Sequence, residues 1–181
     1  FFVFAVTWAF GGPLSVDKQN DFRKEFHLQF TGTFADIARQ YPSDGLVFDH
    51  FFDPEQKQFV PWSGRISEYH APKGGIGPGH GQEPFGNLVV STMDTTRMSF
   101  LLDSLASNNH CAMLVGGAGT GKTTVIQTYL HGTEENVLGK YISMNYFTDS
   151  KNLQQQLEAN LEKRSGRTFG PKPGQKIIYF I

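Results

Sequence analysis

The chain has a single cysteine, Cys111, among its 181 residues. No disulfide can therefore form within it, and the composition fits a reducing compartment. Cys111 stands at the start of a short apolar run that leads into a glycine-rich motif. We expect it to be a small core residue rather than a reactive thiol.

The sequence also has no strong excess of charge and no long hydrophobic run. Its 16 Lys and Arg stand against 17 Asp and Glu, for a net charge of −1. A nucleic-acid partner is not expected, because such a surface needs clustered cations. The most apolar stretch, Phe1–Phe10, has no basic flank and about half the length needed to cross a bilayer. We expect neither a signal peptide nor a membrane segment.

Recognisable metal-ligand spacings are lacking as well. His70 and His80 do not have the spacing of a zinc site, and Asp49, Asp53 and Glu55 do not have that of an EF-hand. The three carboxylates could be drawn as a cation site or as an acid/base pair. A turn acid before a proline, with solvated neighbours, explains them better.

One motif dominates the sequence: Gly116–Thr123 spells G-x-x-x-x-G-K-[ST], the phosphate-binding P-loop. The apolar run Met113–Val115 before it predicts a buried parallel strand. After it, Lys122–Leu130 carries apolar residues at the spacing of one helix face. Strand, glycine loop and helix is the order that a P-loop requires. A glycine-rich turn without a ligand is the alternative, and this context makes it the weaker one.

Each position of the motif has a chemical reason. Glycines let backbone N–H groups approach a phosphate, and the helix N-terminus adds free N–H groups and the positive end of its dipole. We expect Lys122 to reach the β- and γ-phosphates, Thr123 to ligate Mg²⁺ and Thr124 to donate to an α-phosphate. The predicted site, for ATP or ADP with Mg²⁺, consists of Gly116, Gly117, Ala118, Gly119, Thr120, Gly121, Lys122, Thr123 and Thr124.

The first 63 residues predict a mainly helical unit with a small hairpin. Phe1–Phe10 is apolar nearly all round and predicts a buried helix that Gly11-Gly12-Pro13 ends. Phenylalanines at steps of four predict an amphipathic helix over Asp17–Gln40, with Thr31–Thr33 as the point where it could be interrupted. Two short strands around a turn are expected over Leu46–Trp62.

Glycine and proline dominate Gly64–Gly86, which predicts a linker. Several elements are expected after it: a helix that begins near Asp94 and ends at Asn108-Asn109, the P-loop helix capped at His131-Gly132, a strand over Lys140–Phe147 with Asn145 as a strand polar group, a helix over Ser150–Lys163 ended by Gly166, and a strand over Ile177–Ile181. With the P-loop strand, the order is β-α-β-α-β. Right-handed crossovers then predict a parallel sheet covered by helices.

Taken together, these motifs resemble the dynein heavy chain, whose motor is a ring of six AAA+ modules on one polypeptide. The P-loop half of the resemblance rests on Ser91–Leu102, Gly116–Thr123, Arg164–Pro171 and Lys176–Ile181. The segments that resemble the closing part of the second module are Phe4–Gly12, Phe48–Glu55 and Phe59–Trp62. This resemblance would place the P-loop in the third module. Gly64–Gly86 departs from the family's more aliphatic pattern and is an insertion or an imperfect piece of sequence.

The resemblance implies a truncated P-loop AAA+ α/β fold. Residues 1–63 would be the lid-like end of a preceding module, residues 64–87 a linker, and residues 88–181 the N-terminal half of the next module. Both ends look cut, and the resemblance puts the Walker B acids after Ile181. We expect these residues alone to fold poorly and to hydrolyse no ATP above background.

The implied function is ATP binding in a motor that moves along microtubules in the cytoskeleton, with the axoneme of a cilium or flagellum as the favoured place. Implied partners are the neighbouring AAA+ modules and, through the parent protein, dynein intermediate and light chains and microtubules. Neither nucleic acid nor membrane is implied. A regulatory module that binds nucleotide without hydrolysing it, another P-loop ATPase, and a truncated non-functional product are the alternatives. The residues after Ile181 would distinguish them.

Overall fold

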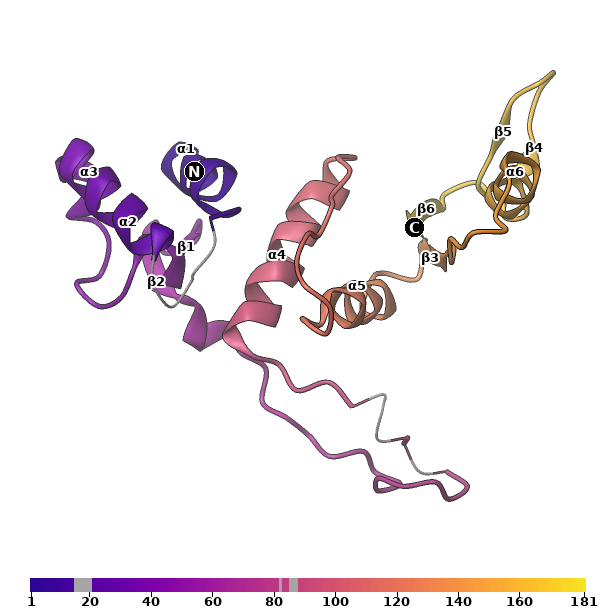
Figure 1. Ribbon diagram of the computed structural model, residues 1–181, viewed down its shortest axis with the longest axis horizontal. Helices are drawn as coiled ribbons and strands as arrows, with labels where there is room; N and C mark the ends of the chain where they lie inside the picture. The colour runs from indigo at the N-terminus through magenta and orange to yellow at the C-terminus, as the bar shows by residue number, and fades with distance from the viewer. Residues whose placement is uncertain (15–20, 82, 85–87) are drawn as a thin grey trace. The chain divides into compact units, whose positions relative to one another are not determined.

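The computed structural model describes residues 1–14, 21–81, 83–84 and 88–181 (Figure 1). The chain divides into two units. The first comprises residues 1–71 and 90–96, and the second residues 72–89 and 97–181. Residues 17–20 of the predicted amphipathic helix and residues 82 and 85–87 of the predicted linker lie outside the described residues.

The first unit begins with the predicted apolar helix, seen as α1 (Phe2–Val6) and the π-helical turn η1 (Thr7–Gly11). Helix α2 (Phe22–Thr33) follows, capped by Asp21, whose carboxylate accepts a hydrogen bond from the Lys24 N–H at 3.0 Å. Phe34 has a non-helical backbone and separates α2 from α3 (Ala35–Ala38). The interruption therefore lies one residue beyond the predicted Thr31–Thr33.

The predicted hairpin is present as β1 (His50–Asp53) and β2 (Gln58–Pro61), paired antiparallel with Asp53 opposite Gln58. Asp53 is a turn acid, as expected, because its Oδ1 accepts hydrogen bonds from the N–H groups of Glu55 and Gln56. The expected strand start at Leu46 is wrong. Side chains rather than a neighbouring strand bind the backbone there, and Val47–Asp49 forms the 3₁₀ turn η2.

The core of the first unit forms where η1, α2, η2 and the turn η3 (Trp62–Arg65) meet. Trp62 is fully buried, and Val47 and Phe48 are each 1% exposed. The Arg23 guanidinium donates to the Gly12 and Leu14 carbonyls and lies 5.4 Å from the centre of the Phe48 ring. Aromatic packing and this arginine therefore hold α2 against the end of η1.

Little regular structure is found between η3 and the next helix. Among the described residues of the predicted linker beyond η3, the backbone forms turns, one closed by the Gly75 N–H on the Pro72 carbonyl at 2.9 Å, and an isolated bridge between Ile76 and Glu83. Within the described ranges, no group of three His, Cys, Asp or Glu side chains is close enough to hold a metal ion. None of the helices that the structure describes, in either unit, is long and apolar enough to span a membrane.

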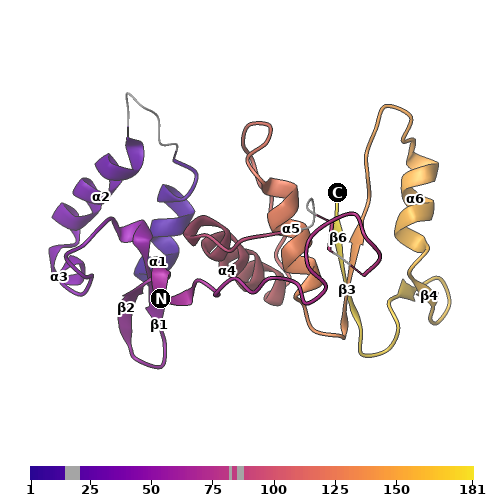
Figure 2. The ribbon, with the colours of Figure 1, turned by 90° about the horizontal axis from the view of Figure 1, so that it is seen from below.

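Helix α4 (Met93–Ser107) ends as predicted, with Asn109 in the left-handed region at φ 59°. In the second unit, the parallel pair β3 (Val137–Tyr141) and β6 (Lys176–Phe180) joins Val137 to Lys176 and Tyr141 to Phe180 (Figure 2). The Lys176 ammonium donates to the Ala106 carbonyl near the end of α4. A parallel pair with helices beside it confirms the predicted α/β class.

The strand expected over Lys140–Phe147 lies earlier, because β3 is confined to the residues that find partners along β6. Asn145 is not a strand residue. Its Oδ1 accepts from the Phe147 N–H at 2.9 Å, which closes a local turn. Helix α6 (Ser150–Glu158) begins after its cap Asp149, whose carboxylate accepts from the Asn152 N–H at 2.7 Å.

Helix α6 also ends five residues before the predicted Lys163. Instead, β4 (Glu162–Lys163) pairs antiparallel with β5 (Phe169–Gly170). Gly166, expected to end the helix, has φ 63° and lies within the turn of this hairpin. The pairing of β4 with β5 gives hydrogen bonds to backbone groups that would bond within the helix if α6 were longer.

Candidate functional site: the phosphate-binding loop

The loop that the motif predicts passes directly into helix α5 (Lys122–His131), which begins and ends within one residue of the predicted bounds. Gly119 and Gly121 have φ of 74° and 78°, a conformation that an L side chain would strain. Gly121 is the N-cap and has no side chain, so no side chain caps the first N–H groups of α5. Those groups can donate to an anion.

Lys122 folds back over this loop. Its ammonium donates to the Gly116 carbonyl at 3.0 Å, to the Gly117 carbonyl, and to Thr120 Oγ1 at 3.2 Å. The Thr120 hydroxyl donates in turn to the Gly117 carbonyl at 3.0 Å. A positive charge therefore lies over a curved backbone, an arrangement suited to phosphate oxygens.

The structure brings together four of the predicted residues, Gly116, Gly117, Thr120 and Lys122, through these hydrogen bonds. Thr123 and Thr124 lie exposed on the first turn of α5, where their hydroxyls are accessible. The motif alone did not predict that Thr120 closes the loop. The sequence signal for this contact was a threonine three residues after a glycine, a spacing at which the hydroxyl can donate to the glycine carbonyl.

The segment before the loop does not form the predicted strand. His110–Gly117 forms neither helix nor strand, and Met113 and Val115 are 85% and 82% exposed. A parallel strand needs a neighbour, and within the described residues β3 and β6 pair with each other rather than with this segment. Cys111 is exposed for the same reason, so its assignment to the core is wrong.

Helix α5 is positioned by contacts on two sides. Val125 is buried, and the Leu130 side chain packs over Gly139 of β3. On the other side, the Tyr129 hydroxyl lies 3.4 Å from a carboxylate oxygen of Asp103 in α4. Burial, together with the charge and hydrogen bond of Asp103, raises the pKa of Tyr129 above its usual value. The helical spacing of the sequence places Tyr129 on the apolar face of α5, but no motif points to its contact with Asp103 or to the close approach of Leu130 to Gly139.

Gly139→Ala is expected to push α5 away from β3 and to destabilise the second unit by about 1–3 kcal/mol, because an overpacked contact strains its neighbours. A Cβ at this position would lie 3.0 Å from the Cβ of Leu130. Urea unfolding followed by far-ultraviolet circular dichroism would measure the loss. Gly132→Ala is the matched control, since a Cβ there meets nothing closer than 3.5 Å. Equal losses in the two variants would contradict the proposed contact.

Two family models match the chain. Residues 79–181 match the one described as P-loop containing dynein motor region, and residues 1–64 match the one described as Dynein heavy chain AAA lid domain. The first match contains the whole P-loop and helix α5.

Curated relatives agree with these matches along the whole chain. The chain is 38% identical to the dynein beta chain of the flagellar outer arm from Chlamydomonas reinhardtii, over 99% of its own length. It is 38% identical to the ciliary dynein beta chain of Tripneustes gratilla and 37% identical to human dynein axonemal heavy chain 9, each over 100% of its length. In every case the chain spans 4% of the relative's length.

Proposed function

Because this chain belongs to the family of P-loop containing dynein motor regions, we propose that it binds Mg·ATP or Mg·ADP as part of a dynein heavy-chain motor. The observation that carries the proposal is the Lys122 ammonium over the Gly116–Gly117 carbonyls, beside an α5 N-terminus without a side-chain cap. These groups supply charge and N–H donors at one place, as a triphosphate requires.

Each predicted residue has a role in this proposal. Backbone N–H groups of Gly116–Gly121 surround the β-phosphate, and Lys122 exchanges its loop carbonyls for β- and γ-phosphate oxygens. The Thr123 hydroxyl would ligate Mg²⁺ and the Thr124 hydroxyl would donate to the α-phosphate, since both residues lie exposed on the first turn of α5. Bound Mg²⁺ would neutralise phosphate charge, while these residues bind and orient the nucleotide.

We assign the parts of the chain accordingly. Residues 1–63 form the lid-like end of one AAA+ module, residues 64–87 a linker, and residues 88–181 the N-terminal half of the next. The matches of residues 1–64 to a lid domain and of residues 79–181 to a motor region support this division. The P-loop module is third in the ring, where its nucleotide gates a motor driven mainly by another module.

We place the parent protein in the axoneme of a cilium or flagellum, because its relatives are named flagellar, ciliary and axonemal dynein chains. Its partners would be the neighbouring AAA+ modules, dynein intermediate and light chains, and microtubules. A coupling free energy of about 1–3 kcal/mol between modules would change microtubule affinity or stepping by roughly five- to 150-fold.

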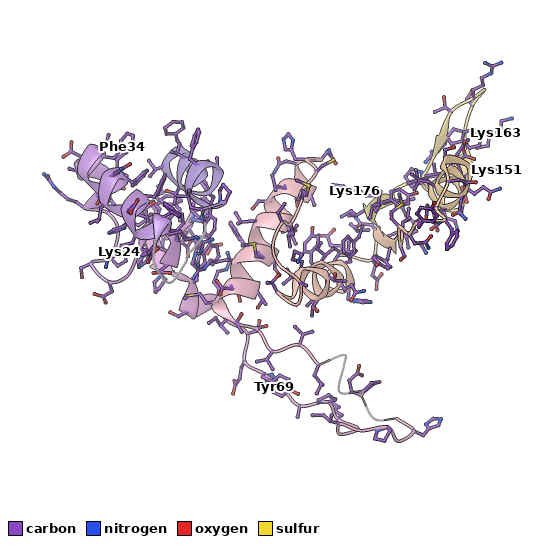
Figure 3. The ribbon with its side chains drawn as sticks, in the orientation of Figure 1. Lys24, Phe34, Tyr69, Lys151, Lys163 and Lys176 are labelled. Atoms are coloured by element: carbon purple, nitrogen blue, oxygen red, sulfur yellow. The ribbon has the colours of Figure 1, made fainter. Side chains whose placement is uncertain are left out.

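Lys122→Ala in the full-length heavy chain tests the gating role. We expect slowed microtubule gliding with substantial basal ATPase retained, because the variant weakens nucleotide binding at this module and not at the principal one. Gliding speed and ATPase are measured separately on the same preparation. Lys151→Ala, which removes a lysine from an exposed position of α6, is the control and should leave both unchanged (Figure 3).

Two other outcomes would support different functions. Complete loss of ATPase in Lys122→Ala would make this the principal hydrolytic site. The assignment of the P-loop module to the third position in the ring would then be wrong. No change in gliding or ATPase would reduce the P-loop to a structural nucleotide site.

A further inference from the structure

The Thr120 hydroxyl lies between the Lys122 ammonium and the backbone of the phosphate-binding loop. It donates its proton to the Gly117 carbonyl at 3.0 Å, and its oxygen accepts a hydrogen bond from Lys122 Nζ at 3.2 Å. A threonine hydroxyl has one proton and two lone pairs, whereas an ammonium only donates. The hydroxyl can therefore serve both partners in one orientation only, with its proton on the carbonyl and a lone pair toward the lysine.

The loop backbone holds this hydroxyl in place. Gly119 and Gly121, on either side of Thr120, have φ of 74° and 78°, so the chain turns both before and after the threonine. A Cβ at Gly116 would lie 3.4 Å from Thr120 Oγ1, so this oxygen lies over the Gly116 backbone. The branched Cβ of threonine also restricts rotation about χ1. Thr120 Oγ1 is therefore a fixed acceptor within the loop.

Lys122 lacks such a constraint of its own. Its ammonium ends a flexible four-carbon stem and has three protons to donate. The structure shows these donations to the Gly116 carbonyl, the Gly117 carbonyl and Thr120 Oγ1. Among the described residues, no carboxylate forms an ion pair with Lys122. The ammonium is thus held by neutral acceptors of the loop alone, and it must release some of them to bind phosphate oxygens.

The two carbonyls can be released at little cost. The Gly117 carbonyl already accepts the Thr120 proton, so it stays hydrogen-bonded when the ammonium turns to a phosphate. The Gly116 residue is exposed, so water can bind its carbonyl. If the β- and γ-phosphate oxygens take the place of both carbonyls, two of the three ammonium protons go to the nucleotide. The third remains on Thr120 Oγ1, which then joins the lysine to the loop.

We propose that Thr120 is a positioning residue for the nucleotide: its hydroxyl holds the Lys122 ammonium toward the phosphates and keeps the Gly117 carbonyl hydrogen-bonded. This inference rests on the proposed function and adds to it a role for a side chain at a position that the motif leaves unspecified. Its effect on affinity is exerted through Lys122, because a lysine that is already held in place loses less side-chain freedom when the nucleotide binds.

The test is a double-mutant cycle in the full-length heavy chain, titrated with Mg·mant-ADP, a fluorescent nucleotide that the motor does not hydrolyse. The binding phase that Lys122→Ala shifts belongs to this site. Thr120→Val keeps the branched shape without the hydroxyl and should weaken this phase about three- to tenfold. Thr120→Ser keeps the hydroxyl and should bind within about twofold of the wild type. In the Lys122→Ala background, Thr120→Val should change the affinity by less than about twofold, because the ammonium that it positions is gone.

Thr133→Val is the matched control. The Thr133 hydroxyl also donates to a carbonyl three residues earlier, that of Leu130 at 2.8 Å, but just past the other end of α5. Its loss should leave the nucleotide affinity unchanged. Thr120→Ala, which also lacks the hydroxyl, replaces Thr120→Val if that variant does not fold.

Three outcomes would overturn the inference while the proposed function stands: wild-type affinity in Thr120→Val, an equal loss from Thr120→Val with and without Lys122, or a loss in Thr120→Ser as large as in Thr120→Val. The second outcome would mean that the hydroxyl acts on the loop and not on the lysine. Failure of the proposed function looks different, because Lys122→Ala would then shift no binding phase, and the inference would fail with it.

Discussion

Mg·ATP is expected to bind Lys122→Ala about ten- to a hundredfold more weakly than the wild type. Charge-assisted hydrogen bonds contribute about 1.5–3 kcal/mol each, and alanine removes the ammonium that lies over the loop. The loop glycines and the α5 N-terminus remain, so residual binding is expected. Isothermal titration calorimetry of a chain that contains the complete module would measure both affinities.

Two controls separate this effect from unfolding. The far-ultraviolet spectrum of Lys122→Ala should match the wild type, because the lysine lies at the surface end of α5 and its removal leaves Val125 buried. Lys151→Ala removes an equal charge from α6 and should bind nucleotide normally. Equal affinities of the wild type and Lys122→Ala would contradict the nucleotide site itself.

Trp62→Ala is expected to destabilise the first unit by about 3–5 kcal/mol, a large share of the stability of a small domain. Trp62 is fully buried, its ring centre lies 4.8 Å from that of Phe51, and its indole N–H binds the Phe48 carbonyl. Alanine leaves both a cavity and a buried carbonyl without its donor. Urea unfolding followed by the fluorescence of Trp8 would measure the loss.

Phenylalanine variants divide this loss into its parts. Trp62→Phe restores most of the volume but not the hydrogen bond, whereas the Trp8 indole N–H, also buried, has no acceptor among the described residues. Trp62→Phe should therefore lower the free energy of unfolding of the first unit more than Trp8→Phe does, by about 1–3 kcal/mol. The reverse order would mean that the Phe48 carbonyl does not need its indole donor.

Sequence alone determined the features whose causes lie within a few neighbouring residues. The P-loop and α5 follow from glycine spacing and helical periodicity between Gly116 and His131, and Asn108-Asn109 ends α4 because asparagine tolerates the left-handed region. The β1–β2 hairpin follows from turn residues between two short apolar runs. In each case a local preference and the final structure agree.

Tertiary structure decided the features whose partners are distant in sequence. The P-loop strand was predicted from Met113–Val115, but a strand forms only where another chain segment offers hydrogen bonds, and β6 pairs with Val137–Tyr141 instead. The same holds for the end of α6, where the β4–β5 hairpin competes with helix.

Contacts between a side chain and a distant backbone group were equally invisible. Val47 N–H meets His27 twenty residues away, Trp62 meets Phe48 fourteen residues away, and Lys176 meets Ala106 seventy residues away. No periodicity or motif encodes such pairs, because they depend on where packing brings two elements together. Sequence therefore determined that this protein has a P-loop, while tertiary packing decided what holds α5 behind it and which side chains bind buried backbone groups.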